Sequence, residues 1–504
     1  MNRTQKFALN STTAALYQII AMLLGFITPS LMISTYGSEV NGLVSSINQL
    51  ISYISLVEAG LSGAAVFSLY KPLANNDQAG VNGIVSAAKQ FYIKTGYIFS
   101  AAALLLGVLF ALMKSTQALS PFMVFFLVML LSANGCVDFF VLARFRVILT
   151  ADQRMYVISL LSTIQVVIRA VVITVSCKFN LHVLVLYALA LLPIFVKVVV
   201  LYYYCKRAYP YLDFTAEPNI ESLGRRYDVI YQQVLGTVQT GAPTVIATVF
   251  LNLVTVSVYS VYNMVLNGIN GVLNIFVSGL SAGFGELIAK KEYDNLRKTT
   301  SEFEVAYYFI LSVVYGLTMA LLLPFIEIYT RNFHDANYYI PSLAVLMVLN
   351  GICYSVKVPQ SMLMISAGMY KEQRWRATAQ AIIIVVGGIV LVQFMGLQGV
   401  MISSILSNVY RTIDLLLYVP KHITHSSIPR TARRILGVFI NSIIVCLPTF
   451  FFEFKPNSYV SWTAYAMALG IYAVAIVGMI TYLLDRAEFH FLKGRILKIL
   501  MRRK

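Results

Sequence analysis

The fold is decided by residues 255–283, TVSVYSVYNMVLNGINGVLNIFVSGLSAG, a largely apolar stretch without a single charge. A helix needs about 20 such residues to cross a bilayer core. The polar residues recur every three or four positions, so on a helix they lie within an arc of about 80° and extend over about 27 Å. They are Asn263, Asn267, Asn270, Asn274, Ser278 and Ser281. Hydrogen-bonding groups are costly in lipid, so this face must contact other helices or water.

Similar polar rows occur in four further apolar segments. They are Ser45, Asn48, Gln49, Ser52 and Ser55; Ser162, Gln165, Arg169 and Ser176; Gln233, Thr237, Thr240, Thr244 and Thr248; and Asn350, Tyr354, Lys357 and Ser361. Interhelical packing through small and polar residues explains one such row. Five rows, two of which carry a cation, favour a water-filled cavity.

The composition of the whole chain agrees with a membrane protein. Of its 504 residues, 59% are apolar and only 12% are charged, too few charges to cover a soluble protein of this size. A soluble enzyme, a disordered chain and a disulfide scaffold are excluded. The five cysteines fall in apolar segments without a CxxC pair, so they indicate neither a metal site nor a disulfide framework.

The sequence predicts an all-α polytopic membrane protein of about fourteen transmembrane helices, arranged as two parallel six-helix lobes with two accessory C-terminal helices. The spans are 9–35, 42–69, 87–113, 122–149, 155–177, 181–205, 227–250, 255–283, 304–329, 339–367, 377–395, 400–418, 435–454 and 460–484. The division between spans eleven and twelve rests only on Gly396-Leu397-Gln398-Gly399.

The charge distribution orients these spans. With both termini in the cytoplasm, 31 of the 38 Lys and Arg belong to cytoplasmic segments and span ends. Four lie outside, namely Lys114, Lys178, Arg331 and Lys455. This bias follows the positive-inside rule and accounts for the net charge of +17 without nucleic acid. The basic tail 485–504 is expected to lie on anionic membrane lipids.

An internal repeat defines the expected domains. The same tripeptide, Gly60-Leu61-Ser62 and Gly279-Leu280-Ser281, ends the second and the eighth span. Six spans separate the copies, and an even number predicts parallel repeats. The expected parts are an N-lobe (1–206), a cytoplasmic linker (207–226), a C-lobe (227–420), the accessory pair (435–484) and the tail (485–504).

Charged residues inside the spans are candidates for a functional site. Arg169 and Lys357 lie near mid-span and are expected to line the cavity. Lys197 is a third cavity cation, with extension of its side chain to the membrane surface as the alternative. Two acids, Glu58 and Asp138, form a structural ion pair or carry a coupling H⁺ or Na⁺.

Other charged and titratable residues receive simpler interpretations. Arg144 and Arg146 lie near a cytoplasmic helix end and are interpreted as topology signals. His422 and His425 form an HxxH pair in a basic loop that is not expected to bind metal. Because there is no Walker A, GxSxG or HExxH sequence, the chain is predicted to be a transporter without cofactor or metal, and not an enzyme.

Several short motifs, in their order and spacing, resemble those of one family. They are Tyr36-Gly37, Leu56 to Ser62, Leu69 to Ala74, Ala151 to Tyr156, Tyr209 to Phe214, Val258 to Tyr262, Phe284 to Ala289 and Gly396 to Val400. The sequence resembles the Wzx-type O-antigen and capsule flippases, polysaccharide transporters of the multidrug/oligosaccharidyl-lipid/polysaccharide exporter superfamily. It departs from the family pattern at Gly241-Ala242-Pro243 and at Gln380, where many members carry carboxylates.

The resemblance implies a multi-pass protein of the bacterial cytoplasmic membrane. It implies flipping of undecaprenyl-pyrophosphate-linked oligosaccharide from the inner to the outer leaflet, for surface polysaccharide such as O-antigen, capsule or exopolysaccharide. Other polysaccharide-assembly proteins are candidate partners. We expect the cavity cations to hold the pyrophosphate, and Asn48, Asn263, Asn267, Asn270, Asn274, Asn350 and Gln165 to contact sugar hydroxyls.

Two alternatives remain open from the sequence. A multidrug or ion antiporter of the same superfamily would export cations and require intramembrane acids, whereas here three bases face two acids in mid-span. A membrane glycan polymerase or ligase would require a sizeable external loop. No predicted outside loop exceeds about ten residues, and this argues against such an enzyme.

Reporter fusions test the predicted topology. Fusions after Lys114, Arg331 and Lys455 should report outside, and those after Arg226 and Lys298 should report inside. A C-terminus that reports outside would mean an odd number of spans and would contradict the two-lobe alignment.

Overall fold

The computed structural model describes residues 3–58, 61–113, 116–219, 227–278, 280–451 and 457–488. Within these ranges the chain is helical and has no strand, which confirms the predicted all-α class. Several sequence predictions lie outside the described residues. They concern Lys114, Lys455, residues 220–226 of the linker and the tail from residue 489.

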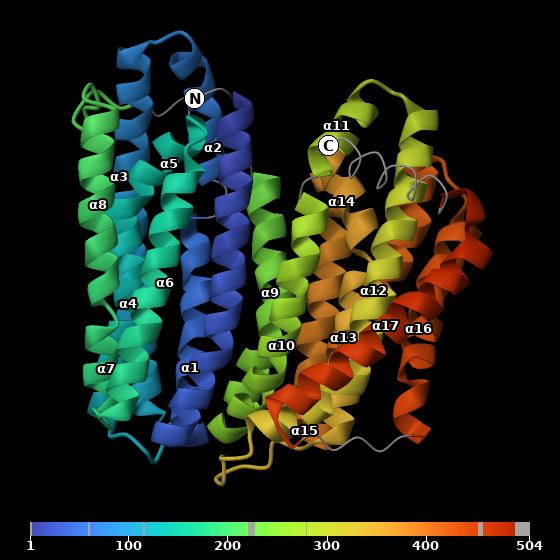
Figure 1. Cartoon of the computed structure of the whole chain (residues 1–504). Helices are drawn as coiled ribbons and strands as arrows, with labels where there is room; N and C mark the ends of the chain where they lie inside the picture. The colour runs from blue at the N-terminus through green and yellow to red at the C-terminus, as the bar shows by residue number, and fades with distance from the viewer. Residues whose placement is uncertain are drawn as a thin grey trace. The chain divides into compact units, whose positions relative to one another are not determined.

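The helices follow one another with short connections (Figure 1). The first group is α1 (Arg3–Ile54), α2 (Leu61–Ala74), α3 (Gln78–Leu112), α4 (Pro121–Val137), α5 (Ala143–Ala151), α6 (Met155–Lys178), α7 (Val183–Leu189) and α8 (Leu192–Ala208). The second is α9 (Tyr227–Phe250), α10 (Leu253–Ser278), α11 (Ser281–Ala289), α12 (Tyr293–Tyr329), α13 (Pro341–Ser355), α14 (Val358–Ser366), α15 (Tyr370–Val419), α16 (Ile428–Phe451) and α17 (Tyr459–Leu484). Three short irregular turns are η1 (Ser55–Glu58), η2 (Asp138–Leu142) and η3 (Pro420–Thr424).

Ten of the described helical segments are long and apolar enough to cross a membrane. Two of them, Ala8–Glu58 and Tyr370–Thr424, each correspond to two predicted spans, because the chain leaves helical geometry at Gly37 and Gly396. The helices α9 and α10 fall outside the ten because their Gln, Thr and Asn rows lower the mean hydropathy. These two helices and the two bends account for the fourteen predicted spans.

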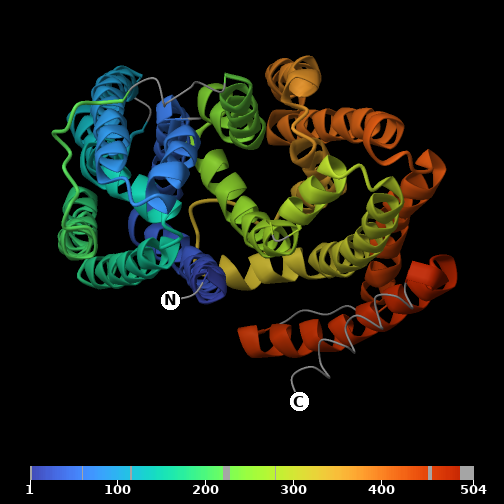
Figure 2. The same cartoon turned by 90° about the horizontal axis from the view of Figure 1, so that it is seen from above.

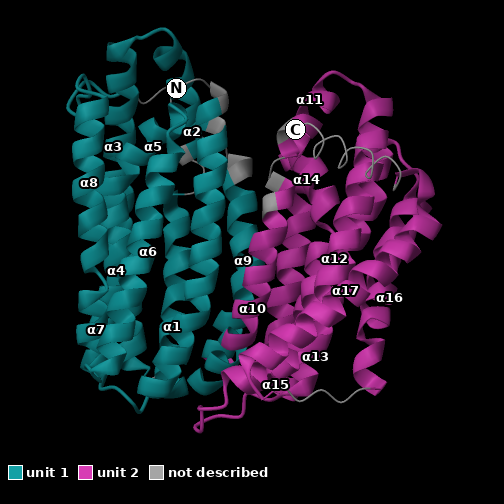
Figure 3. Ribbon diagram, viewed as in Figure 1, with its two compact units in different colours: residues 1–248, 252–260 teal, residues 249–251, 261–504 magenta. Residues whose placement is uncertain are grey.

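The chain divides into two compact units (Figure 3). Unit 1 comprises residues 1–248 and 252–260, and unit 2 comprises residues 249–251 and 261–504. Most of α9 thus packs within unit 1, while most of α10 belongs to unit 2. The lobe boundaries at residues 206 and 227 remain a prediction.

Turn positions recur between the two groups of helices. Residues with a positive φ angle occur in both groups, at a nearly constant offset along the chain. Asn76, Gln153 and Asn180 of the first group correspond, in this order, to Lys291, Gly368 and Gly396 of the second. The same offset relates the bend at Gly37 to Asn252, which separates α9 from α10. These turns lie 215 or 216 residues apart, whereas the two Gly-Leu-Ser copies lie 219 residues apart (279 minus 60), so the internal repeat and its register remain a prediction.

Both units contain helices that are interrupted inside a span. In unit 1, α1 ends in the turn η1, and the π-helical turn η2 separates α4 from α5. In unit 2, α13 and α14 are separated at Val356 and Lys357, where Pro359 in the first turn of α14 provides no N–H for a helical bond. Such interruptions leave backbone groups and side chains for other partners.

The accessory helices α16 and α17 pack along α12 at the edge of unit 2 (Figure 2). Their contact buries a small apolar cluster of Val313, Val445, Ala473 and Val477. Gly316 of α12 allows this approach, because a Cβ atom there would lie 2.7 Å from Cβ of Val445.

A matched pair of glycines in α1 tests the packing of unit 1. A Cβ atom on Gly42 would collide with the backbone carbonyl of Leu253, whereas one on Gly25 meets no atom within 4 Å. We expect Gly42→Ala to lower the thermal unfolding midpoint in detergent by about 3–10 °C, because helix α1 must move away from α10. Gly25→Ala should leave the midpoint unchanged or raise it. Equal midpoints for the two variants would contradict the close approach.

Candidate functional site

Lys357 lies at the interruption between α13 and α14 and is only 7% exposed. Its ammonium Nζ donates to Oδ1 of Asn408 at 2.5 Å and lies 4.9 Å from the ring centre of Tyr354. Asn408 in turn donates to Asn350 at 3.0 Å and accepts from Gln380 at 3.3 Å. Among the described residues no carboxylate lies within ion-pair distance of Lys357. The cation is therefore held by amides and an aromatic face alone.

Lys197 of α8 occupies a comparable environment in unit 1. Its ammonium donates to Ser162 at 3.0 Å and to Oε1 of Gln165 at 3.2 Å. The offset of the repeated turns also relates Gln165 to Gln380, so corresponding glutamines lie near a lysine in both units. The side chain of Lys197 points toward α6. It does not extend along its own helix toward the membrane surface, which was the alternative interpretation.

Arg169 follows Gln165 by one turn of α6 and is half-buried. Within the described part of the chain its guanidinium has no hydrogen-bond or ion-pair partner. Five donors of a permanently charged group are thus left for another ligand.

Glu58 and Asp138 both form ion pairs with Arg146. From its place near a helix end, this arginine was interpreted as a topology signal. Arg146 of α5 donates to Oε1 of Glu58 at 2.5 Å and to Oδ2 of Asp138 at 3.0 Å. The two acids come from the interruptions η1 and η2. They share Arg146, and neither forms an ion pair with Arg169, Lys197 or Lys357. Nothing in the local sequence marks this pairing, since 88 residues separate Arg146 from Glu58.

The asparagines of the α10 row differ in their hydrogen bonds and in their exposure. Asn270 accepts hydrogen bonds from Tyr315 at 3.2 Å and Ser355 at 3.4 Å. Asn263 is half-buried, and Asn267 and Asn274 are exposed, as is Asn48 of α1. These four make no hydrogen bond to the residues that the structure describes. Their amides remain accessible to water or ligand.

The threonine row of α9 needs no partner helix. The hydroxyls of Thr237, Thr240 and Thr248 donate to backbone carbonyls three or four residues earlier. Thr248 also bonds Ser46 of α1 at 2.7 Å within unit 1. This row is therefore a weaker indication of a cavity than the asparagine row.

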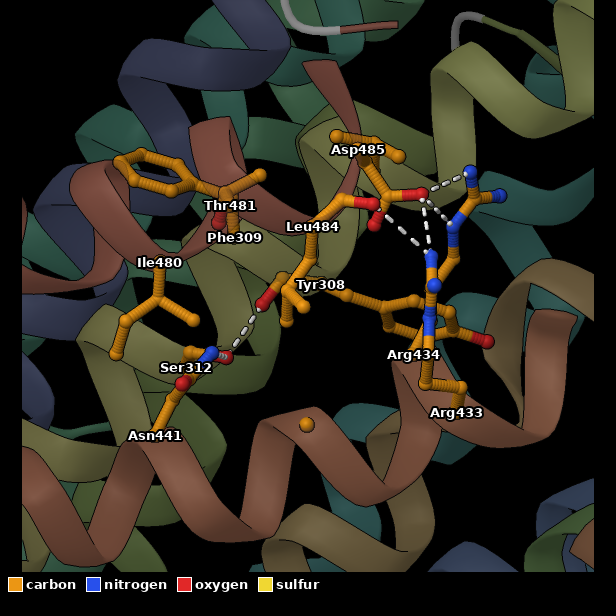
Figure 4. A pocket seen from close by; sticks show the side chains of 12 residues that line it. Tyr308, Phe309, Ser312, Arg433, Arg434, Asn441, Ile480, Thr481, Leu484 and Asp485 are labelled. Carbon is orange, nitrogen blue, oxygen red and sulfur yellow. Dashed lines mark hydrogen bonds and ion pairs between the residues drawn. The ribbon is translucent and has the colours of Figure 1, made fainter. Parts of the chain in front are cut away.

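A buried charge cluster in unit 2 escaped the sequence analysis. Glu304 of α12 accepts from Gln360 at 2.8 Å, Thr431 at 3.1 Å and Arg434 at 3.0 Å. Arg434 also bonds Asp485 at 2.8 Å, so the cluster ties α16 and the end of α17 to α12 (Figure 4). The sequence does contain one indication of this cluster, because Glu304 is a charged residue inside the predicted span 304–329.

A small pocket of about 40 Å³ lies beside this cluster (Figure 4). Its lining combines polar and charged residues with a smaller apolar part. The polar and charged residues are Tyr308, Ser312, Asn441, Thr481, Arg433, Arg434 and Asp485. That volume holds one or two waters, not a sugar or a lipid. Because the cluster is internally paired and the pocket is small, we interpret this region as an anchor for the accessory helices.

Two motifs of the family resemblance meet outside the spans. Asp152, from the segment Ala151 to Tyr156, forms ion pairs with Lys6 at 2.8 Å and Arg154 at 2.6 Å and accepts from Tyr209 at 2.7 Å. Burial raises the pKa of Asp152, but hydrogen bonds from Lys6 and Tyr209 and the charge of Arg154 outweigh it, so the pKa is below its usual value. The stabilisation is present at neutral pH and is lost as the pH falls through the folded-state pKa.

Comparison with known proteins identifies the fold. No family model matches the chain, and no curated protein matches it. Among solved structures, an inward-facing multidrug resistance MATE family transporter of the MOP superfamily superposes with a TM-score of 0.66 at 15% identity, covering 85% of this chain and 99% of the other. The lipid II flippase MurJ, in an inward closed conformation, gives 0.64 at 14% identity, covering 93% and 98%. A MATE in the straight conformation gives 0.56 at 15% identity, covering 87% and 98%.

The chain has the fold of these transporter and flippase structures. The expected superfamily and its Wzx-type branch remain proposals. At 14–15% identity the likeness defines the architecture, so the substrate must be inferred from side chains.

Cysteine labelling tests which faces of α10 contact water. In a cysteine-free background, Cys at 267 and 274 should react rapidly with a small water-soluble thiol reagent, and Cys at 270 more slowly, because Asn270 is hydrogen-bonded. Cys at 272, which replaces an exposed valine on another face, should be protected by lipid. Equal protection of 267, 272 and 274 would mean that the asparagine row is a dry helix interface.

Proposed function

We propose that the protein is a flippase for lipid-linked oligosaccharide. It moves undecaprenyl-pyrophosphate-linked repeat units from the cytoplasmic to the outer leaflet of the bacterial cytoplasmic membrane, for surface polysaccharide biosynthesis. Transport proceeds by alternating access, in which the substrate site opens to one side of the membrane at a time. The MurJ neighbour, a lipid II flippase, supports a lipid-linked substrate for this fold.

The proposal rests on a difference between the acids and the bases inside the spans: the acids form ion pairs, whereas several of the bases do not. Four intramembrane acids among the described residues each pair with arginine, namely Glu58, Asp138, Glu304 and Asp414. By contrast, Arg169 and Lys357 have no carboxylate partner there, and Lys197 hydrogen-bonds only to the neutral Ser162 and Gln165 while Asp138 lies farther away. Buried cations with only neutral partners strongly favour an anionic ligand, because charge interactions are strong where water is excluded. A pyrophosphate group provides that charge.

The amide side chains provide the second part of the recognition. Asn48, Asn267 and Asn274 are exposed and have no hydrogen-bond partner among the described residues. Each amide offers two donors and an acceptor, which match the hydroxyl groups of sugars. Asn263 adds a further half-buried amide to the same helix as Asn267 and Asn274.

The same pairing distinguishes the flippase from the multidrug antiporter, to which the MATE neighbours point. An organic cation would require a carboxylate that is free to bind it. Each of these four acids is already held by an arginine, and a fifth acid of the predicted span 304–329, Glu327, is exposed two residues from the end of α12. Export of anionic lipid-linked sugar therefore fits the charges better than export of cations.

Charge substitutions test the proposed function. Arg169→Gln, Lys197→Gln and Lys357→Gln should each reduce export of the surface glycan at normal protein levels, by about tenfold if one charged contact is lost. Arg169→Lys should retain part of the activity, because a charge remains although the planar fork is lost. Charge reversal of Arg169 or Lys357 to Glu should abolish export.

An exposed cation provides the matched control. Lys290 forms an ion pair with Glu286 and is 59% exposed, so Lys290→Gln should export normally. If all three cavity variants export as well as Lys290→Gln, the proposed function is wrong. Accumulation of lipid-linked oligosaccharide in the inner leaflet of the variants would distinguish a transport defect from a synthesis defect.

A further inference from the structure

The strongest unassigned feature of unit 1 is a group of four charges, which we call the Arg146 cluster. It consists of Glu58, Asp138, Arg146 and Lys197. Arg146 pairs with both acids, and Lys197 is close enough to Asp138 and Arg146 to interact with them electrostatically. Two positive and two negative charges balance one another.

The geometry of the cluster resembles an occupied binding site. Two terminal nitrogens of one guanidinium each hold a carboxylate from a different chain segment, and both segments are helix interruptions. Broken helices of this kind commonly form ion and substrate sites in transporters. The planar fork of arginine binds phosphate oxygens in the same way as carboxylate oxygens.

The cluster is also accessible. The side chains of Arg146, Glu58 and Asp138 are 29%, 19% and 31% exposed, in contrast to 4% for both Arg434 and Glu304 in the buried anchor of unit 2. A ligand can therefore reach the Arg146 fork, whereas the unit 2 pair is enclosed by protein.

We infer that Arg146 and Lys197 bind the diphosphate of the substrate, and that Glu58 and Asp138 occupy Arg146 in its absence. This inference rests on the proposed function. A diphosphate diester carries two negative charges and replaces the two carboxylates on the guanidinium. Each displaced carboxylate takes one proton from water, so the site again has two positive and two negative charges. The other titratable group that interacts with the cluster is Tyr92 of α3.

The inference gives the acids a role in coupling. Binding of one diphosphate takes up as many as two protons, and release returns them. Because the carboxylates compete with substrate for Arg146, the apparent affinity equals the intrinsic affinity multiplied by the fraction of molecules in which the guanidinium of Arg146 is free. Affinity therefore weakens as the pH rises and the carboxylates hold their charge.

Binding of an undecaprenyl-pyrophosphate-linked sugar, which is a diphosphate diester, to the purified full chain in detergent tests this inference. In weakly buffered solution the wild type should take up protons on binding. The double variant Glu58→Gln/Asp138→Asn should bind about tenfold more tightly, if the fork is free in one molecule in ten, and should show neither proton uptake nor pH dependence. Arg146→Gln should lose binding by about tenfold or more, and Arg146→Lys should recover part of it.

The controls separate this inference from the proposed function. Lys290→Gln/Glu286→Gln removes an exposed ion pair and should behave as wild type. Binding without proton uptake, or wild-type binding by the neutral triple variant Glu58→Gln/Asp138→Asn/Arg146→Gln, overturns the inference and leaves the flippase proposal intact. Failure of the wild type to bind the undecaprenyl-pyrophosphate-linked sugar at all contradicts the flippase proposal itself.

Discussion

The absence of water from the bilayer core is the constraint on which the rest of this structure depends. Each backbone N–H and C=O inside the membrane must bond within its own helix, and an interruption is tolerated only where other groups replace the missing partners. The interruptions here coincide with the functional candidates. Glu58 belongs to η1, Asp138 begins η2, and Lys357 precedes α14. Irregular backbone and charge therefore occur together.

The same constraint gives each charge a different role according to its partners. Glu304 and Arg434 are buried and bonded on several sides, so they hold the accessory helices to α12 and leave no room for a ligand. Lys357 is also buried, but among the described residues its ammonium bonds the amide of Asn408, lies near the ring of Tyr354 and has no carboxylate within ion-pair distance. A cation stabilised in that way gains from a further anion, whereas the enclosed pair of Glu304 and Arg434 does not.

The polar rows show how far residue periodicity can be interpreted. Periodicity placed the asparagines of α10 on one face, and the structure leaves Asn267 and Asn274 exposed while it bonds Asn270 to Tyr315. The threonines of α9 have the same periodicity but satisfy their hydroxyls on their own helix. Threonine has a short hydroxyl that reaches the preceding turn, whereas an asparagine amide has more groups than one helix can satisfy.

The sequence by itself determined the helical, multi-span architecture and the bends near Gly37 and Gly396, because hydrophobic length and turn residues are local properties of the chain. It also selected Lys197 and Lys357, since a charge within a long apolar segment is conspicuous. Only the tertiary structure decided which charges meet. Arg146 is unremarkable near a helix end, yet it holds Glu58 and Asp138, because packing brings together three segments that the linear sequence keeps apart.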